Sequence, residues 1–224
     1  MAKHLQKEIE KTKKMILALS AAVEEAVRKA IKAVETRDSG LAEKIIANDP
    51  AVDEMEVDVE EEVLKILALH QPVAIDLRFL VSALKINNDL ERIGDLAVNL
   101  AERAIFLSTF KAAATRFDLR ELAEKVQWML RSSLDSLVNL DAALARKVCV
   151  MDDDVDEIHR GMYRKVEDAM VAHPEQAAVI LNWLTVSRYL ERIADHATNI
   201  AEDVIYMIEG EIVRHKPELG HGDG

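Results

Sequence analysis

Two stretches of this chain decide its fold: LERIGDLAVNLAE at residues 90–102 and LERIADHATNIAE at residues 190–202. They lie 100 residues apart and share the Leu-Glu-Arg-Ile start, the aspartate, the asparagine and the Ala-Glu end. In both, apolar residues recur at the three- and four-residue spacing of an amphipathic helix. Because a long internal repeat marks a duplicated structural unit, we expect the chain to contain one supersecondary unit twice.

A second, weaker repeat precedes the first. Val52-Asp53-Glu54-Met55 corresponds to Val155-Asp156-Glu157-Ile158 at a separation of 103 residues. The drift of three residues is what a connecting loop of slightly different length would give. The duplication therefore extends beyond the single helix that carries the first repeat.

Helical spacing of apolar residues continues through nearly the whole chain. Half of the residues are apolar, and only 7 Gly and 4 Pro interrupt the 224 residues, which favours α-helix. Arg37-Asp38-Ser39-Gly40 ends the first helix, and Asp38 or Ser39 can cap the next. Within the second helix we expect an interruption at Asn48-Asp49-Pro50, since proline disfavours a helical residue before it. The later helices are expected at 41–70, 74–108, 117–147, 151–173 and 175–209, the last stopped by Gly210.

Short connections between long helices favour antiparallel bundles. We therefore predict an all-α protein made of two tandem, sequence-related three-helix bundles. The first bundle spans 1–110, the second spans 115–212, and a tail follows at 213–224.

The charge of the chain excludes some classes of partner. The formal net charge is −12, which repels phosphate backbones and anionic lipid surfaces, so no nucleic acid partner is expected. No apolar run reaches the roughly 20 residues of a membrane-spanning helix, so no transmembrane segment is expected. Cys149 is the only cysteine, which precludes an internal disulfide, fits a reducing compartment and is expected to be an ordinary packed residue.

The repeated acidic residues form pairs. Residues four apart share a helix face, so Glu91 and Asp95 point the same way. The other pairs with this spacing are Asp49 with Asp53, Asp152 with Asp156, and Glu191 with Asp195. In an antiparallel bundle two facing pairs can converge, and four carboxylates in one place repel each other unless a cation neutralises them. Oxygen ligands suit Fe, Mn, Mg or Ca, with Zn also possible, while a solvated acidic face is the alternative interpretation.

The same segments argue against an enzyme. Di-iron oxidases of the ferritin type place a histidine three residues after a glutamate, and here Gly94 and Ala194 stand at that place in the two repeats. Asp156 and His159 form an Asp-x-x-His, but Glu56 occupies the aligned position in the first half, so we expect a surface histidine. No glycine-rich phosphate loop or nucleophile motif is visible. We expect no catalytic residues, no organic cofactor and no enzymatic activity.

These segments resemble the PhoU family of bacterial phosphate-signalling proteins. The residues that carry the resemblance are His70-Gln71-Pro72, Asp76-Leu77-Arg78, the segment 89–95 and the segment 189–196, and the resemblance covers about residues 5–215. It implies two similar three-helix bundles side by side. It also implies a protein that is cytoplasmic, typically a homodimer, and peripheral at the inner membrane through protein partners.

The resemblance further implies a function. Family members are negative regulators of phosphate uptake and phosphate-starvation signalling, and they link the phosphate ABC transporter, through its ATPase subunit, to a sensor histidine kinase. Some members bind iron or zinc clusters through E(D)xxxD motifs. Carried over to this sequence, the metal ligands are Asp49, Asp53, Glu91, Asp95, Asp152, Asp156, Glu191 and Asp195.

The two copies differ at several positions: Leu96 stands in the first where the second has His196, and Gly94 stands in the first where the second has Ala194. If the histidine assists a metal or a partner, only the second half retains it. Two other functions stay open at this point. One is a metal-storage or carboxylate-bridged metal redox bundle, and the other is a purely structural helical module with solvated acidic faces.

Overall fold

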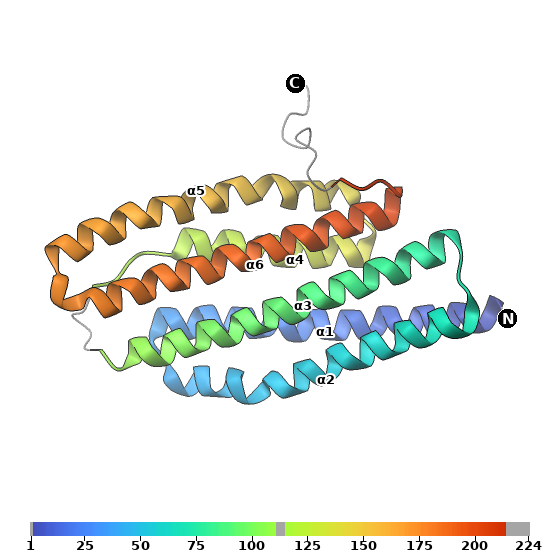
Figure 1. The fold of residues 1–224 in the computed structure, drawn as a ribbon, viewed down its shortest axis with the longest axis horizontal. Coiled ribbons are helices and arrows are strands. Elements are labelled where there is room, and N and C mark those ends of the chain that lie inside the picture. The colour runs from blue at the N-terminus through green and yellow to red at the C-terminus, as the bar shows by residue number, and fades with distance from the viewer. Residues whose placement is uncertain (1, 111–114, 214–224) are drawn as a thin grey trace, which may run out of the picture.

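The chain folds into two bundles of three helices, which pack along a shared seam (Figure 1). The structure is a computed structural model that describes residues 2–110 and 115–213. The described helices are α1 Ala2–Thr36, α2 Ser39–His70, α3 Ala74–Ser108, α4 Arg120–Asn139, α5 Ala142–Ala172 and α6 Ala177–Glu209, with a 3₁₀ turn at Pro174–Gln176. The predicted all-α class with two tandem three-helix bundles is confirmed. The division at 1–110 and 115–212 stays a prediction, and the expected tail lies outside the described residues from 214 onward.

The helices α3 and α6, which carry the two repeats, form the seam between the bundles. They run in opposite directions and lie side by side in the middle of the molecule (Figure 1). The leucine and isoleucine of each repeat are buried core residues, at Leu90, Ile93, Leu190 and Ile193. Burying such a side chain stabilises the fold by about 1.5–3 kcal/mol. With these residues in the core, the acidic residues between them face α2 in the first bundle and α5 in the second.

The turns that start α2 and α5 are built alike. Arg37 and Leu140, which are 103 residues apart, both adopt a left-handed backbone with φ of 53°. The next residues, Asp38 and Asp141, are N-caps whose carboxylates each accept the backbone N–H three residues later at 2.9 Å. The expected cap at Asp38 is therefore confirmed. The expected helix at 117–147 is wrong, because the turn at Leu140 divides it into α4 and α5.

The expected interruption at Pro50 is also wrong, because α2 continues through it. Proline removes one helical hydrogen bond, but Ile45 and Val52 on either side of it are buried in the core. Packing of this apolar face outweighs the local preference, since most helical stability in proteins comes from tertiary contacts.

None of the helices in the described ranges combines the length and the hydropathy that spanning a bilayer requires. Cys149 is partly buried and packs against the core, as expected.

Candidate metal centre

The second bundle brings three of the predicted carboxylates together. Glu191 and Asp195 lie one turn apart on α6 and face Asp156 on α5. One carboxylate oxygen from each lies within 4.8 Å of the other two. An all-oxygen set of this kind suits hard cations such as Mg²⁺, Mn²⁺ or iron. The two helices thus bring together three carboxylates, a pair from one and a single residue from the other.

Asp152, the fourth predicted residue of this half, lies beside the three. It precedes Asp156 by about one turn of α5, and its Oδ1 accepts a hydrogen bond from Thr198 Oγ1 at 3.1 Å. The negative charges of Asp195 and Asp156 both act on its carboxylate. Asp152 is therefore positioned at the edge of the cluster by a donor from α6.

The pKa values of this cluster are shifted upward. Burial, followed by repulsion from Asp195 and Asp156, raises the pKa of Asp152 to about 6. Burial, followed by repulsion from Glu191 and Asp156, raises the pKa of Asp195 to about 6, although by accessible surface the residue is exposed to solvent. Burial and Asp156 also raise the pKa of Glu191. A cation is the group that would relieve this repulsion, so the donor set fits a metal ion.

The first bundle does not gather its four acidic residues in the same way. Burial, followed by repulsion from neighbouring carboxylates, raises the pKa of Asp49 and of Glu91. Within the described residues, however, no three of these acidic side chains come as close as those of the second half. Arg92 supplies positive charge here, with Nε 3.3 Å from Glu91 Oε2 and Nη1 3.8 Å from Asp95 Oδ2. The first half is thus a looser version of the second, with Arg92 in ion-pair contact with its acidic residues.

The residues around Asp49 explain part of this difference. Val98 stands where the second half has Thr198, so no hydroxyl at that position can hold Asp49 as Thr198 holds Asp152. Asp49, Gly94 and Val98 instead line an open groove of about 540 Å³ between the first three helices. The two halves share the sequence pattern but differ in how closely their acidic side chains approach one another.

Next to the acidic residues, each bundle has a polar contact between two helices that the sequence did not predict. His159 was expected at the surface, and this is wrong, because the side chain is buried and its Nδ1 lies 2.9 Å from Ser187 Oγ. It follows Val155, a core residue, by one turn on the side of α5 that faces α6. Burial lowers its pKa, so the imidazole is neutral at pH 7. At the position aligned with His159, Glu56 accepts a hydrogen bond from Asn87 Nδ2 at 2.8 Å. Glu56 lies 103 residues before His159 and Asn87 lies 100 residues before Ser187, so the two repeat separations relate one contact to the other.

His196 does not join the carboxylate cluster. Its Nδ1 lies 2.8 Å from Oδ1 of Asp89 on α3, and Asn199 Nδ2 donates to the same oxygen at 3.2 Å. Leu96, the corresponding residue of the first copy, is buried in the core. The difference between the copies therefore belongs to the contact between the bundles.

Comparison with known proteins places these features in a family context. A family model described as PhoU domain matches residues 16–104 and again residues 119–204. A relative from Pseudomonas aeruginosa, named phosphate-specific transport system accessory protein PhoU homolog, is 39% identical over 93% of this chain and 86% of its own length. A relative of the same name from Aquifex aeolicus is 39% identical over 95% of this chain and 96% of its own length.

Two solved structures share the fold. The crystal structure of PhoU from Pseudomonas aeruginosa has a TM-score of 0.88 and 37% identity, covering 92% of this chain and 99% of that one. The crystal structure of the phosphate transport system regulatory protein PhoU from Streptococcus pneumoniae has a TM-score of 0.86 and 27% identity, covering 93% and 99%. These names describe accessory or regulatory proteins and not enzymes.

Proposed function

The chain belongs to the PhoU family, and from this premise we propose that it is a negative regulator of phosphate uptake and phosphate-starvation signalling. It acts without catalysis, as a cytoplasmic homodimeric adaptor that contacts the ATPase subunit of the phosphate ABC transporter and a sensor histidine kinase. These contacts hold it at the inner membrane. By binding one state of the kinase more tightly than the other, it shifts the kinase toward its inactive population.

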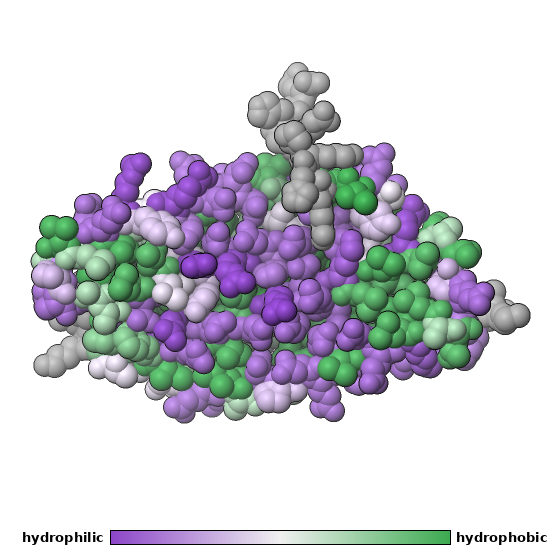
Figure 2. All heavy atoms as spheres, in the orientation of Figure 1, coloured by the Kyte–Doolittle hydropathy of each residue, from purple (hydrophilic) through white to green (hydrophobic). Residues whose placement is uncertain are grey.

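An exposed apolar patch at the turn between α2 and α3 carries this proposal. The α2–α3 patch consists of Leu69, Val73, Ile75 and Leu77, whose exposed fractions are 66%, 73%, 69% and 40%. Figure 2 shows hydrophobic side chains gathered over the end of the molecule where this turn lies, while the middle of the same face is largely hydrophilic. Large apolar side chains left exposed together mark a protein contact. An adaptor needs such a surface, whereas a metal-storage bundle does not.

The carboxylate cluster gives the adaptor a metal site. We propose that Asp156, Glu191 and Asp195, with Asp152 beside them, hold a divalent or trivalent ion. Family resemblance favours iron or zinc, and the ligand chemistry also admits Mg, Mn or Ca. Asp49, Asp53, Glu91 and Asp95 form the weaker second site of the first bundle. Each bound ion ties two helices of its bundle together and makes that bundle more rigid.

Metal analysis of protein purified without chelator and without nickel affinity steps tests this part. About one equivalent or more is expected in the wild type, with a clear loss in Asp195→Asn and a smaller loss in Asp95→Asn. Less than about 0.1 equivalent, unchanged by either substitution, contradicts the metal sites and leaves the adaptor role standing.

A second candidate function is a metal-storage or carboxylate-bridged redox bundle, which the cluster of Asp156, Glu191 and Asp195 favours. It has less support, because His159 is directed at Ser187 and so does not serve as the nitrogen ligand of a ferritin-type site. It predicts oxygen consumption when iron(II) is added. The adaptor predicts none.

The adaptor itself is tested by binding of the purified chain to the purified ATPase subunit of the phosphate transporter. Ile75→Glu, in the α2–α3 patch, is expected to weaken binding at least about tenfold, since it places a charge in an apolar contact. Val171→Glu is the matched control, because Val171 is 86% exposed on α5 and lies outside the patch. Equal binding by wild type, Ile75→Glu and Val171→Glu contradicts the role of the patch.

A further inference from the structure

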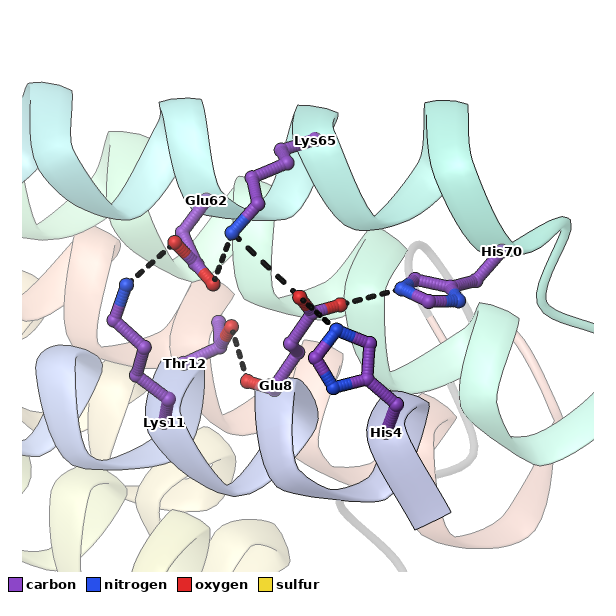
Figure 3. Close-up of polar contacts among 7 residues, drawn as sticks. All are labelled: His4, Glu8, Lys11, Thr12, Glu62, Lys65 and His70. Carbon is purple, nitrogen blue, oxygen red and sulfur yellow. Dashed lines mark hydrogen bonds and ion pairs between the residues drawn. The ribbon is translucent and has the colours of Figure 1, made fainter. Parts of the chain in front are cut away.

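A second group of metal-ligating side chains lies where α1 begins and α2 ends. Figure 3 shows His4 and Glu8 from α1 and His70 from α2 directed at one another. One nitrogen of each histidine and one oxygen of Glu8 lie within 4.8 Å of one another. We propose that these three residues bind a transition-metal ion, with Zn²⁺ as the best fit. The His4–Glu8–His70 site is separate from the acidic pairs and differs from them in its nitrogen ligands.

The separation of His4 and Glu8 fits a small metal centre, whereas His70 lies closer to Glu8 than two ligands of one ion do. His4 Nε2 lies 3.4 Å from Glu8 Oε1, and His70 Nε2 lies 2.6 Å from Glu8 Oε2. Zinc ligands at about 2.0–2.2 Å from the ion in a tetrahedron are separated from one another by about 3.4 Å. His4 is one turn before Glu8 on the same face of α1, and His70 is the last residue of α2. For one ion to bind all three, His70 Nε2 and Glu8 Oε2 have to move apart from 2.6 Å to about 3.4 Å.

The buried atoms of this group lack directed hydrogen bonds. Glu8 is 9% exposed, and among the described residues neither its Oε2 nor Nε2 of His70 forms a hydrogen bond, despite their short approach. With a proton on Nε2, His70 and Glu8 form the close ion pair seen at 2.6 Å. Without that proton, the imidazole nitrogen and the carboxylate oxygen are two acceptors facing each other, and a metal ion takes the place of the proton between them. A metal ion uses both lone pairs at once and removes this conflict.

One competing cation is already present, and the structure gives it another partner. Lys65 Nζ lies 3.6 Å from Glu8 Oε1 and 3.4 Å from Oε1 of Glu62. Glu62 in turn accepts a hydrogen bond from Lys11 Nζ at 2.6 Å (Figure 3). When an ion binds to Glu8, the lysine can therefore turn fully to Glu62. Its positive charge should weaken metal binding and not abolish it.

The mixed ligand set determines which ion binds. Two imidazole nitrogens and one carboxylate oxygen favour Zn²⁺ and related transition metals over Mg²⁺ or Ca²⁺. Three protein ligands leave a fourth position for water. The bound ion ties the first turn of α1 to the last turn of α2, immediately before the turn that leads to α3. It thus fastens an end of the bundle that otherwise depends on ion pairs of Glu8.

Cobalt(II) titration of protein without a histidine tag tests the proposal. Four-coordinate Co²⁺ absorbs visible light far more strongly than the octahedral ion that an all-carboxylate site binds. One equivalent of Co²⁺ is expected to give this strong absorption. His4→Ala and His70→Ala are expected to abolish it or to weaken Co²⁺ binding at least about tenfold. Lys65→Gln is expected to tighten binding.

Two controls isolate the site. His173→Ala removes an exposed histidine elsewhere in the chain and is expected to leave the absorption unchanged. Asp195→Asn alters the acidic cluster and is expected to leave it unchanged as well. Because His4 is largely exposed, His4→Ala folds normally and decides the test even if His70→Ala is unstable. Absence of the strong absorption in the wild type, or equal absorption and affinity in His4→Ala, overturns the proposal.

Discussion

The Nδ1 atom of His196 on α6 lies 2.8 Å from Oδ1 of Asp89 on α3, and this pair joins the two bundles. Asp89 is buried at 6% exposure, and its carboxylate also accepts a hydrogen bond from Asn199 at 3.2 Å. Because an ionised carboxylate only accepts, the histidine donates through Nδ1–H. Lys85 and Asp203 form a second polar contact across the same seam at 3.1 Å.

His196→Ala is therefore expected to lower the free energy of unfolding by about 2 kcal/mol, since it leaves a buried carboxylate short of a donor. Urea unfolding in the presence of a chelator measures the change. In a double-mutant cycle with Asp89→Asn, a coupling of about 1 kcal/mol or more is expected. His173→Ala, at an exposed histidine, should change the stability by no more than about 0.5 kcal/mol. If His196→Ala behaves like this control, the pair does not join the bundles.

The pKa shifts predict how the stability of the metal-free protein depends on pH. The folded pKa values of Asp152 and Asp195 are about 6, above the ordinary value of 3.8, so the folded state holds more protons than the unfolded state between these values. Stability contributed by these two groups is thus present below about pH 4 and is lost as pH rises toward 6. Above pH 6 their repulsion acts in full.

Asp195→Asn should remove part of this loss. At pH 7 with chelator, we expect it to stabilise the protein by about 1 kcal/mol, because water screens the exposed side of the carboxylate. At pH 4 the difference from wild type should nearly vanish. Urea unfolding at both pH values measures this. If Asp195→Asn stabilises the protein more at pH 4 than at pH 7, the raised pKa of Asp195 is contradicted.

Two glycines are expected to respond in opposite directions to substitution by alanine. Gly94 lies inside α3, and a Cβ there would meet only Cγ1 of Val52 at 3.7 Å, an ordinary contact. Gly94→Ala should stabilise the protein by about 1 kcal/mol, as helix propensity predicts. Gly210 ends α6 with φ of 77°, so Gly210→Ala should destabilise by about 1 kcal/mol or more. Thermal unfolding that shows the same sign for both substitutions contradicts this assignment.

Cys149 is expected to react slowly with thiol reagents. Burial, with the negative charges of Glu202 and Asp152, raises the pKa of its thiol to about 12, so little thiolate exists at pH 8. Labelling with a chromogenic disulfide should be at least about tenfold slower in the folded protein than in urea. Equal rates show that the thiol is accessible and unperturbed.

The repeats predict the fold well because their apolar residues are the ones that pack in the core. Their leucines and isoleucines are core residues, so the duplicated phrase implies two bundles. The turn at Leu140 was missed because Asn139-Leu140-Asp141 contains neither glycine nor proline. Leu140 lies 103 residues after Arg37, the separation of the weaker repeat, and this separation indicates a turn equivalent to the one at Arg37. The expected break at Pro50 was wrong because a local preference was outweighed by burial of the flanking apolar residues.

Which acidic residues lie together could be predicted only in part, for a different physical reason. Four-residue spacing places Glu191 and Asp195 on one face of α6, but the register of α5 decides that Asp156 joins them. His4 and His70 meet only because α1 and α2 are antiparallel and nearly equal in length. Contacts between helices depend on their relative register, which the periodicity of apolar residues within one helix does not determine.

The proposed regulatory role is tested most directly by alkaline phosphatase activity in a strain of the source organism that lacks this gene, grown in high phosphate. The account predicts high activity in the deletion strain and a return to the low wild-type level when the gene is restored. Restoration with Ile75→Glu should leave activity high, whereas Val171→Glu should lower it like the wild type. Low activity in the deletion strain, or full repression by Ile75→Glu, contradicts the account.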